Sequence, residues 1–337
     1  MSVRRHTMLC LLAAACSAGC QPGYASRYAI SMTSTGETVE TRLTFDAGVE
    51  FAPSFSPDGR AITYSRTDMI DGRPVSKFWT IDVDGRHARR VTTTANELAE
   101  WTPVWHPDGR RLIWCSDRSG NLDIWALDQS RQQYRQLTTS AAADNFPIWR
   151  PDGRQIAFMS ERDGESAVWL MDPDGVNQRR VSRRETGDLG VSWSRDGNRL
   201  VYVAALHTDA AFHTGAWIIQ HGEPPENGAI VVQELRSGAD RQITSGRWRD
   251  WYPMWNPVND TIAYVSNESG NWDIWLMNSD GSHRVQLTTN PGKDTEPSWS
   301  PDGRSLTYVS ERNGQWDVWL MDVEQTLAGR AAPTTHS

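Results

Sequence analysis

The sequence is short of basic residues, of long apolar runs and of cysteine. It has 34 Lys and Arg against 42 Asp and Glu, which gives a formal net charge of −8 at pH 7. That balance disfavours a general nucleic-acid binder, which needs a basic face for the phosphates. A protein that crosses a membrane repeatedly needs several apolar runs of roughly 20 residues, and the sequence does not arrange its apolar residues in that way.

Only one cysteine falls in the body of the chain. Cys10, Cys16 and Cys20 lie near the amino terminus, and Cys115 lies in a strand-like run. A single thiol cannot form an internal disulfide, so we expect Cys115 to be an inert core residue. Aromatic residues, by contrast, are abundant, and 17 Trp, 8 Tyr and 7 Phe exclude global disorder.

Residues 1–20 have the pattern of a bacterial export signal. Two arginines precede an apolar stretch that is too short to span a membrane as a helix. Residues 17–20 resemble a lipobox, so we predict that Cys20 is lipidated, with Cys16 as the alternative site. Cleavage without lipidation, which would give a soluble exported protein, is the other interpretation. Residues 21–38 are expected to form a linker.

One unit is repeated six times along the chain. The unit is built on Pro-x-Trp-Ser-Pro-Asp-Gly-Arg, and its intact or worn copies occupy residues 53–60, 103–110, 147–154, 191–198, 253–260 and 297–304. Successive copies begin 50, 44, 44, 62 and 44 residues apart. Self-similarity at such a period indicates a repeat architecture.

Each period contains four short strands, lettered a to d here, that are joined by tight turns. Strand a ends in Trp-Ser before the Pro-Asp-Gly turn, strand b alternates apolar residues, strand c carries Asp-Ile-Trp-Leu-Met, and strand d ends in Gln-Leu-Thr. Four antiparallel strands in about 40–45 residues are typical of a β-propeller blade. The sequence therefore predicts an all-β fold, a six-bladed β-propeller over residues 39–322.

The last repeat lacks a strand d of its own, which predicts how the ring closes. Residues 41–44 match the strand-d residues 135–138, so we expect this amino-terminal strand to complete blade six and remove exposed edges. Residues 323–337 are predicted to be a flexible tail. Ten tryptophans at fixed positions of strands a and c are expected to pack between blades: Trp79, Trp105, Trp125, Trp149, Trp169, Trp193, Trp255, Trp275, Trp299 and Trp319.

The repeated Trp-Ser-Pro-Asp-Gly-Arg, Asp-Ile-Trp-Leu-Met and Gln-Leu-Thr strings resemble the propeller of the TolB family of bacterial periplasmic proteins. Similar repeats occur in envelope scaffolds, in the propellers of prolyl-oligopeptidase-type peptidases and in some sugar lyases. The resemblance implies a periplasmic protein–protein interaction module. Residues 21–38 are too few to correspond to the amino-terminal α/β domain of TolB, so the resemblance does not directly imply a role in the Tol system.

Alternating strand directions place the d–a and b–c connections on one face of the propeller. An acid stands three residues before the strand-a proline position of every blade: Glu50, Glu100, Asp144, Asp188, Asp250 and Asp294. We predict that these acids ring the mouth of the central channel, where solvent, arginines, Ca²⁺ or another cation, or a basic partner segment would offset their repulsion. The structural alternative is that each acid hydrogen-bonds within its own blade.

Aromatic residues outside the packing positions fall on the same face and are candidate interface anchors: Trp101, Trp248, Trp251, Tyr252, Trp272 and Trp316. Stacking on neighbouring loops is their structural alternative. The fourth period is 18 residues longer than the usual 44, with an insertion at residues 206–228 that contains Trp217. Long insertions in repeats often mark the binding face. The histidine spacings in this insertion match no standard metal site, so no metal site is assigned.

These features favour a non-catalytic cell-envelope scaffold that binds a protein or peptide through the d–a/b–c loop face and the channel mouth. The sequence has no G-x-S-x-G motif and no Gly-rich phosphate loop, so we predict neither an enzyme nor a cofactor. The alternative is a carbohydrate-active lyase or hydrolase, or a sugar- or cation-binding propeller, that uses the same face.

The expected location is the periplasm. Gln21 after Cys20 favours the outer membrane, by resemblance to sorted lipoproteins. We expect a monomer that does not bind nucleic acid.

Overall fold

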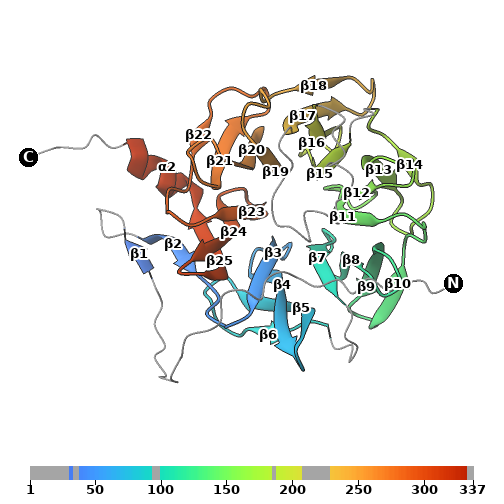
Figure 1. The fold of residues 1–337 in the computed structure, drawn as a ribbon, viewed down its shortest axis with the longest axis horizontal. Coiled ribbons are helices and arrows are strands. Elements are labelled where there is room, and N and C mark those ends of the chain that lie inside the picture. The colour runs from blue at the N-terminus through green and yellow to red at the C-terminus, as the bar shows by residue number, and fades with distance from the viewer. Residues whose placement is uncertain (1–29, 33–37, 93–98, 184–186, 207–227, 332–337) are drawn as a thin grey trace, which may run out of the picture.

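The computed structural model describes residues 30–32, 38–92, 99–183, 187–206 and 228–331. Within them, six antiparallel sheets stand around a common centre like the blades of a propeller (Figure 1). Five sheets have four strands and the sixth has five. The predicted six-bladed β-propeller is confirmed.

Each blade is a meander that runs from the centre of the ring outward. The innermost strands are β3 (Val49–Phe55), β7 (Glu100–Trp105), β11 (Asp144–Trp149), β15 (Asp188–Trp193), β19 (Asp250–Trp255) and β23 (Asp294–Trp299). The second strands are β4 (Ala61–Ile70), β8 (Arg111–Ser116), β12 (Ile156–Ser160), β16 (Arg199–Ala205), β20 (Thr261–Ser266) and β24 (Ser305–Arg312).

The two outer strands of each blade follow. The third strands are β5 (Arg73–Asp82), β9 (Asp123–Asp128), β13 (Ala167–Met171), β17 (Gly228–Glu234), β21 (Asp273–Asn278) and β25 (Gln315–Asp322). The fourth strands of blades one to five are β6 (Arg89–Arg90), β10 (Gln133–Gln136), β14 (Arg179–Arg180), β18 (Asp240–Gln242) and β22 (Val285–Gln286).

Blade six is closed by chain from the other end of the propeller. Strand β2 (Thr38–Arg42) pairs antiparallel with β25, and the Leu43 amide donates to the Val318 carbonyl over 2.8 Å. Leu43 itself is 1% exposed and packs in the core of blades one and six. Strand β1 (Ile30–Met32) adds a fifth strand outside β2. The predicted closure by an amino-terminal strand is therefore confirmed.

The segment after β25 differs from the expected flexible tail, because residues Val323–Ala331 form helix α2. Asp322 caps the helix, since its Oδ1 accepts a hydrogen bond from the Gln325 amide over 2.9 Å. Val323 is buried and Leu327 packs beside it in the core of blades five and six. A capping acid followed by two inward apolar residues thus accounts for a helix that the strand pattern did not predict. Within the described residues, no helix is long and apolar enough to cross a membrane.

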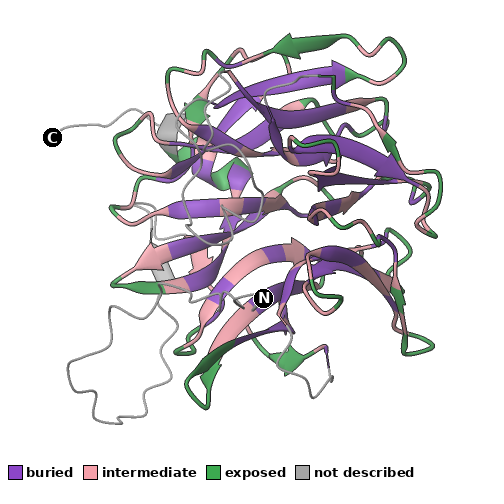
Figure 2. Ribbon diagram, turned by 45° about the vertical axis from the view of Figure 1, so that its right-hand side comes forward, coloured by how far each residue is buried: buried purple, intermediate pink, exposed green. Residues whose placement is uncertain are grey.

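The middle strands of the blades carry most of the core, and the exposed residues gather on outer strands and turns (Figure 2). The strand-a tryptophans hold neighbouring blades together, as predicted. The indole Nε1 of Trp105 donates to Thr63 Oγ1 of blade one over 2.8 Å. The Nε1 of Trp299 donates to the Met254 carbonyl of blade five over 3.0 Å. The indoles of Trp105 and Trp299 therefore combine apolar packing with a polar contact to the preceding blade.

Candidate functional site: the d–a/b–c face and the central channel

The six acids of the inner strands are buried rather than exposed at the channel mouth. Their exposed fractions are at most 2%, and the set is Glu50, Glu100, Asp144, Asp188, Asp250 and Asp294. This burial corrects the expected ring of accessible carboxylates. It favours the structural alternative, because a buried carboxylate needs bonding partners within the protein.

Blade three shows how a buried acid is paired. Arg162 Nη2 lies 3.0 and 2.9 Å from the two carboxylate oxygens of Asp144. The guanidinium carbon of Arg162 lies 4.5 Å from the ring centroid of Trp169 on strand c. Other blades stack an arginine on the strand-c tryptophan in the same way: Arg66 on Trp79, Arg118 on Trp125, Arg284 on Trp275 and Arg312 on Trp319. Such cation–π contacts contribute about 0.5–2 kcal/mol each.

A hydroxyl group from the preceding blade completes this arrangement. Thr44 Oγ1, at the end of the closing strand of blade six, donates to Glu50 Oε2 of blade one over 3.3 Å. Threonine hydroxyls of blades two, four and five lower the pKa of the acids of blades three, five and six: Thr138, Thr244 and Thr288. Thr138 and Thr288 donate to strand-c carboxylates of their own blades, Asp123 and Asp273. The buried acids therefore tie adjacent blades together.

Burial raises the pKa of four of these carboxyl groups, and the surrounding donors oppose that effect: Glu50, Asp144, Asp250 and Asp294. The pKa of Asp294 rises to about 6 because of burial, although hydrogen bonds from Ser310 and Asn290 lower it. Burial, together with the charges of Asp317 and Asp46, raises the pKa of Glu50 to about 9. The proton that Glu50 keeps, and the donors around Asp144 and Asp294, thus reduce the mutual repulsion that a ring of exposed carboxylates would have.

The predicted aromatic anchors divide into two groups. Trp101 and Trp251 are each 7% exposed and belong to the core, which fits their structural alternative. Trp248 and Trp272 are half-buried on the d–a and b–c loops of blade five, where the rings of Trp272 and Trp251 lie 5.7 Å apart, and Trp316 is half-buried near the start of β25. Trp217 lies outside the described residues, as does most of the insertion that contains it.

A β-bulge interrupts every inner strand, and the residue two positions after each acid has a left-handed backbone there. Their φ angles lie between 46° and 55°, and the six residues are Ala52, Thr102, Phe146, Gly190, Tyr252 and Glu296. Residues other than glycine are uncommon in this left-handed region of backbone conformation. Its repetition in six blades shows that one local bend shapes the whole wall of the channel.

These bulge residues meet across the centre of the ring. Glu296 of blade six accepts hydrogen bonds from the Ala52 amide of blade one and, over 3.1 Å, from the Tyr252 hydroxyl of blade five. The rings of Tyr252 and Phe146 lie 6.2 Å apart, although their blades, five and three, are not neighbours. Burial raises the pKa of Glu296, while the two donors lower it. The channel is therefore filled at this level by side chains of several blades.

The sequence interpretation missed two sets of residues. One is the arginine that stands 18 residues after an acid, as Arg118, Arg162 and Arg312 do. The other is the bulge set, of which only Tyr252 was named in advance. Both could have been found by comparing the six repeats position by position, although that comparison does not show which side chains face the axis.

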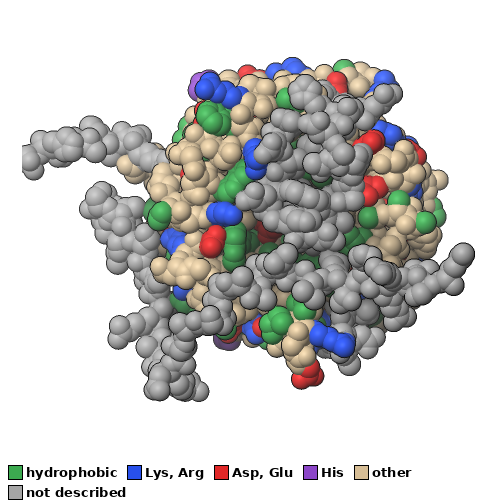
Figure 3. All heavy atoms as spheres, viewed as in Figure 1, with side chains coloured by type: hydrophobic (Ala, Val, Ile, Leu, Met, Phe, Trp, Pro, Cys, Tyr) green, Lys and Arg blue, Asp and Glu red, His purple; other side chains and the backbone are tan. Residues whose placement is uncertain are grey.

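A polar pocket of about 550 Å³ opens between blades five and six on the d–a/b–c face. Its lining includes Asn271, Asn290, Lys293, Glu311 and Asn313. The half-buried Trp316 pairs across the β24–β25 hairpin with Glu311. In the view down the axis, charged and hydrophobic side chains lie next to one another near the centre of the ring (Figure 3). The amide groups of Asn271 and Asn290 donate within the protein, so this sector presents mainly Asn313, charged side chains of both signs and an indole.

Within the described residues, no three His, Cys, Asp or Glu side chains are grouped so that they could hold a metal ion. Cys115 is buried, and burial raises the pKa of its thiol to about 11, as expected for an inert core residue. The predicted cation at the channel mouth stays a prediction.

Comparison with known proteins identifies relatives of the repeat. The family model "TolB beta propeller domain" matches residues 96–224 and 222–335. Dipeptidyl-peptidase 5 of Porphyromonas gingivalis is 31% identical over 96 residues, which are 27% of this chain and 14% of the peptidase. The chain thus spans a small part of that relative.

Solved structures share the fold at low sequence identity. The crystal structure of TolB from Acinetobacter baumannii matches with a TM-score of 0.63 and 20% identity, over 80% of this chain and 61% of that one. An oligogalacturonate lyase in complex with manganese matches with a TM-score of 0.58 and 16% identity, over 89% and 97% of the two chains. Because these identities are low, the matches show the fold and not the function.

The pH dependence of stability tests the buried state of the acids. Because Asp294 keeps its proton to about pH 6 in the folded protein, and an unfolded aspartate releases it near pH 3.9, rising pH favours unfolding between these values. This carboxyl then lowers the free energy of unfolding by about 3 kcal/mol between pH 4 and 7. The variant Asp294→Asn has no carboxyl group at this position, so its free energy of unfolding does not include this decrease.

Urea unfolding of both proteins at a series of pH values measures the effect. We expect the stability of Asp294→Asn, relative to the unsubstituted protein, to rise from pH 4 to pH 7. A stability difference that stays constant over this range would show that the carboxyl titrates as it does in solvent.

Proposed function

The chain belongs to the TolB β-propeller domain family, and from that premise we propose that it is a non-catalytic scaffold of the cell envelope. On this proposal it binds a partner protein or peptide through the d–a/b–c loop face. The carrying observation is that three half-buried tryptophans, Trp248, Trp272 and Trp316, lie on the d–a/b–c side of blades five and six. Tryptophan supplies a large contact area at low entropic cost, which is why it anchors protein interfaces.

The filled channel supports a partner that docks on the face rather than one that passes through the ring. Glu296, Tyr252 and Phe146 occupy the centre at the level of the bulges. A segment that enters the channel mouth would meet the Tyr252 hydroxyl and the Glu296 carboxylate at its floor. A basic side chain would suit that floor, because it would favour the ionised form of Glu296.

Export and membrane attachment are part of the same proposal. The amino-terminal sequence favours cleavage before Cys20, lipidation of that cysteine, and retention of a monomeric propeller in the periplasm at the outer membrane. Strand β1, which pairs with the closing strand β2, starts at Ile30, so on this proposal the interval between Cys20 and Ile30 serves as the tether. The propeller would then lie close to the membrane with a partner-binding face available in the periplasm.

A sugar-binding or sugar-cleaving propeller is the second candidate. The observation that favours it is the amide-rich lining of the pocket between blades five and six, where Asn271, Asn290 and Asn313 stand near the Trp316 hairpin. Amides and an indole are the groups that bind hydroxyl-rich ligands. The fold shared with an oligogalacturonate lyase is consistent with this candidate but does not by itself favour it.

Photo-crosslinking from the loop face tests the scaffold. A benzophenone amino acid replaces Trp316 or Trp248 in the full chain, and a matched control replaces Arg110, an exposed residue of the a–b turn on the opposite face. We expect irradiation in the native envelope to give one discrete protein adduct from positions 316 and 248 and none from position 110.

An adduct of equal yield from position 110 would contradict the assignment of the face. Absence of any adduct, together with binding or turnover of an oligosaccharide by the purified protein, would replace the scaffold with the sugar candidate.

The anchor has a test of its own. Detergent phase separation of the expressed full chain should place the unsubstituted protein in the detergent phase and Cys20→Ser in the aqueous phase. The control Cys16→Ser should stay in the detergent phase, because it leaves the predicted acceptor thiol intact. Release by Cys16→Ser instead would assign the anchor to Cys16, and an unsubstituted protein in the aqueous phase would exclude lipidation.

A further inference from the structure

The crevice between blades three and four differs from the equivalent crevices elsewhere in the ring. In blade three the c–d turn lies against strand d of blade two, so that a Cβ on Gly175 would be 2.4 Å from the Leu137 carbonyl oxygen. In blade five, a Cβ on Gly281 would be 2.3 Å from the Ile243 carbonyl oxygen of blade four. In blade four the corresponding turn glycine is Gly238. A Cβ on Gly238 would instead be nearest to the guanidinium of Arg183, at 2.7 Å.

A shorter turn accounts for this opening. Five residues, 235–239, connect β17 to β18 in blade four, whereas seven residues, 172–178, connect β13 to β14 in blade three. The short turn does not reach over strand d of the preceding blade. A pocket of about 410 Å³ therefore remains at the outer edge of the ring.

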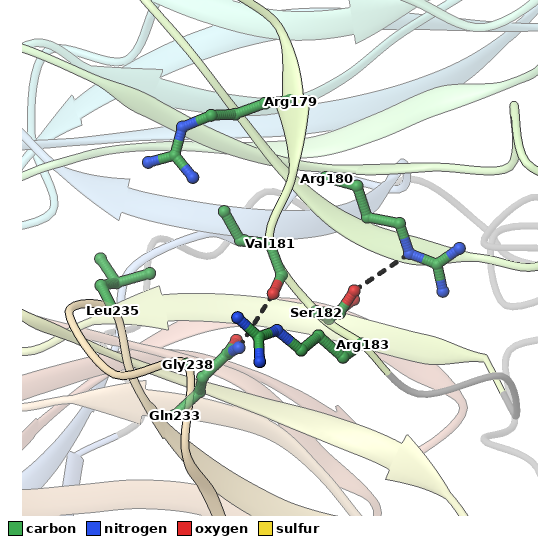
Figure 4. Close-up of a pocket in the computed structure, with 8 residues that line it drawn as sticks. All are labelled: Arg179, Arg180, Val181, Ser182, Arg183, Gln233, Leu235 and Gly238. Carbon is green, nitrogen blue, oxygen red and sulfur yellow. Dashed lines mark hydrogen bonds between the residues drawn. The ribbon is translucent and has the colours of Figure 1, made fainter.

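Two arginines project into this pocket from blade three. Figure 4 shows the guanidinium groups of Arg179 and Arg183 on the same side of the chain as the Val181 side chain, whereas Arg180 points to the other side. Arg180 lies 3.5 Å from Asp163 and donates to the Ser182 carbonyl. Among the described residues, neither Arg179 nor Arg183 forms an ion pair with a carboxylate. Two uncompensated cations facing one cavity, in a chain of net charge −8, indicate a site for an anion.

The floor of the pocket carries a buried amide from blade four. Gln233 is 2% exposed, and its Nε2 donates to the Val181 carbonyl over 2.9 Å, which fixes the orientation of the amide. Its Oε1 is buried and accepts no hydrogen bond within the described residues. An unsatisfied buried acceptor costs about 1–3 kcal/mol, so a ligand that donates a hydrogen bond there would recover this free energy.

We propose that this inter-blade pocket binds the phosphate group of a hydroxyl-bearing phosphate ester, with Arg179 and Arg183 on the phosphate and Gln233 Oε1 accepting from a ligand hydroxyl. Arginine forks match phosphate oxygens, and no carboxylate lines the pocket to repel them. Inorganic phosphate would fill only part of the cavity and would leave Gln233 Oε1 without a hydrogen-bond donor. A sugar phosphate or a phosphoglycerol headgroup supplies both the anion and the hydroxyl. The site lies on the outer rim and is independent of the partner-binding face proposed above.

Calorimetric titration of the full chain tests the site with three probes: glucose 1-phosphate, inorganic phosphate and glucose. We expect glucose 1-phosphate to bind at least tenfold more tightly than either of the other two. Arg183→Gln and Arg179→Gln should each weaken it tenfold or more, because each removes one guanidinium from the anion. The matched control Arg154→Gln, an exposed arginine of the blade-three a–b turn, should bind like the unsubstituted protein.

Vesicles separate the two sources of the phosphate ester. Cosedimentation with phosphatidylglycerol vesicles, but not with phosphatidylcholine vesicles, that is lost in Arg183→Gln would assign a lipid headgroup. Binding of glucose 1-phosphate without cosedimentation would assign a soluble ester. Binding of neither the ester nor the vesicles, or an equal loss in Arg154→Gln, would overturn the proposal. Thermal melting of each variant confirms that a lost signal is not lost folding.

Discussion

The ring depends on how one carboxylate of each blade is buried beside its neighbour. A carboxylate without access to solvent is costly unless donors surround it or it keeps its proton. Here Asp144 forms an ion pair with Arg162 of its own blade, and Thr138 of the blade before lowers the pKa of Asp144. The guanidinium is in turn held against Trp169. Charge, hydroxyl and indole therefore fix one blade relative to the next, and the strand-a tryptophans add direct contacts between blades.

Much of this architecture could be predicted from the sequence, because each repeat contains turn sequences and strand patterns that determine local structure. Pro-Asp-Gly turns, alternating strands and a matching strand at residues 41–44 gave the six blades and their closure. The positions of the acids could be predicted, and of the two interpretations left open burial favours the structural one, since periodicity gives a position along a strand and not what surrounds the side chain in three dimensions. Helix α2 was missed because a cap at Asp322 and two inward apolar residues determine it, and neither belongs to the repeat.

The blade that departs from the repeat shows what the shared contacts contribute. In blade four, Leu206 stands 18 residues after Asp188, where blades two, three and six have arginine. Val231 pairs with Tyr202 where Trp169 pairs with Phe158 in blade three. Blade four also has the short c–d turn beside the open crevice. Loss of the repeated contacts thus coincides with the other features that distinguish blade four from the rest of the ring, which is where a particular function is expected within a common fold.

The central claim is that the buried acid and its arginine act as one unit that holds the blades together. A double-mutant cycle with Asp144→Asn and Arg162→Met, measured by urea unfolding, tests it most directly. The account predicts that Arg162→Met alone costs about 3–5 kcal/mol, because it leaves a buried carboxylate without its cation. Adding Asp144→Asn should recover part of that loss, which gives a coupling energy of about 1–3 kcal/mol. Costs that add to within about 0.5 kcal/mol would contradict the account, because independent sites behave in that way.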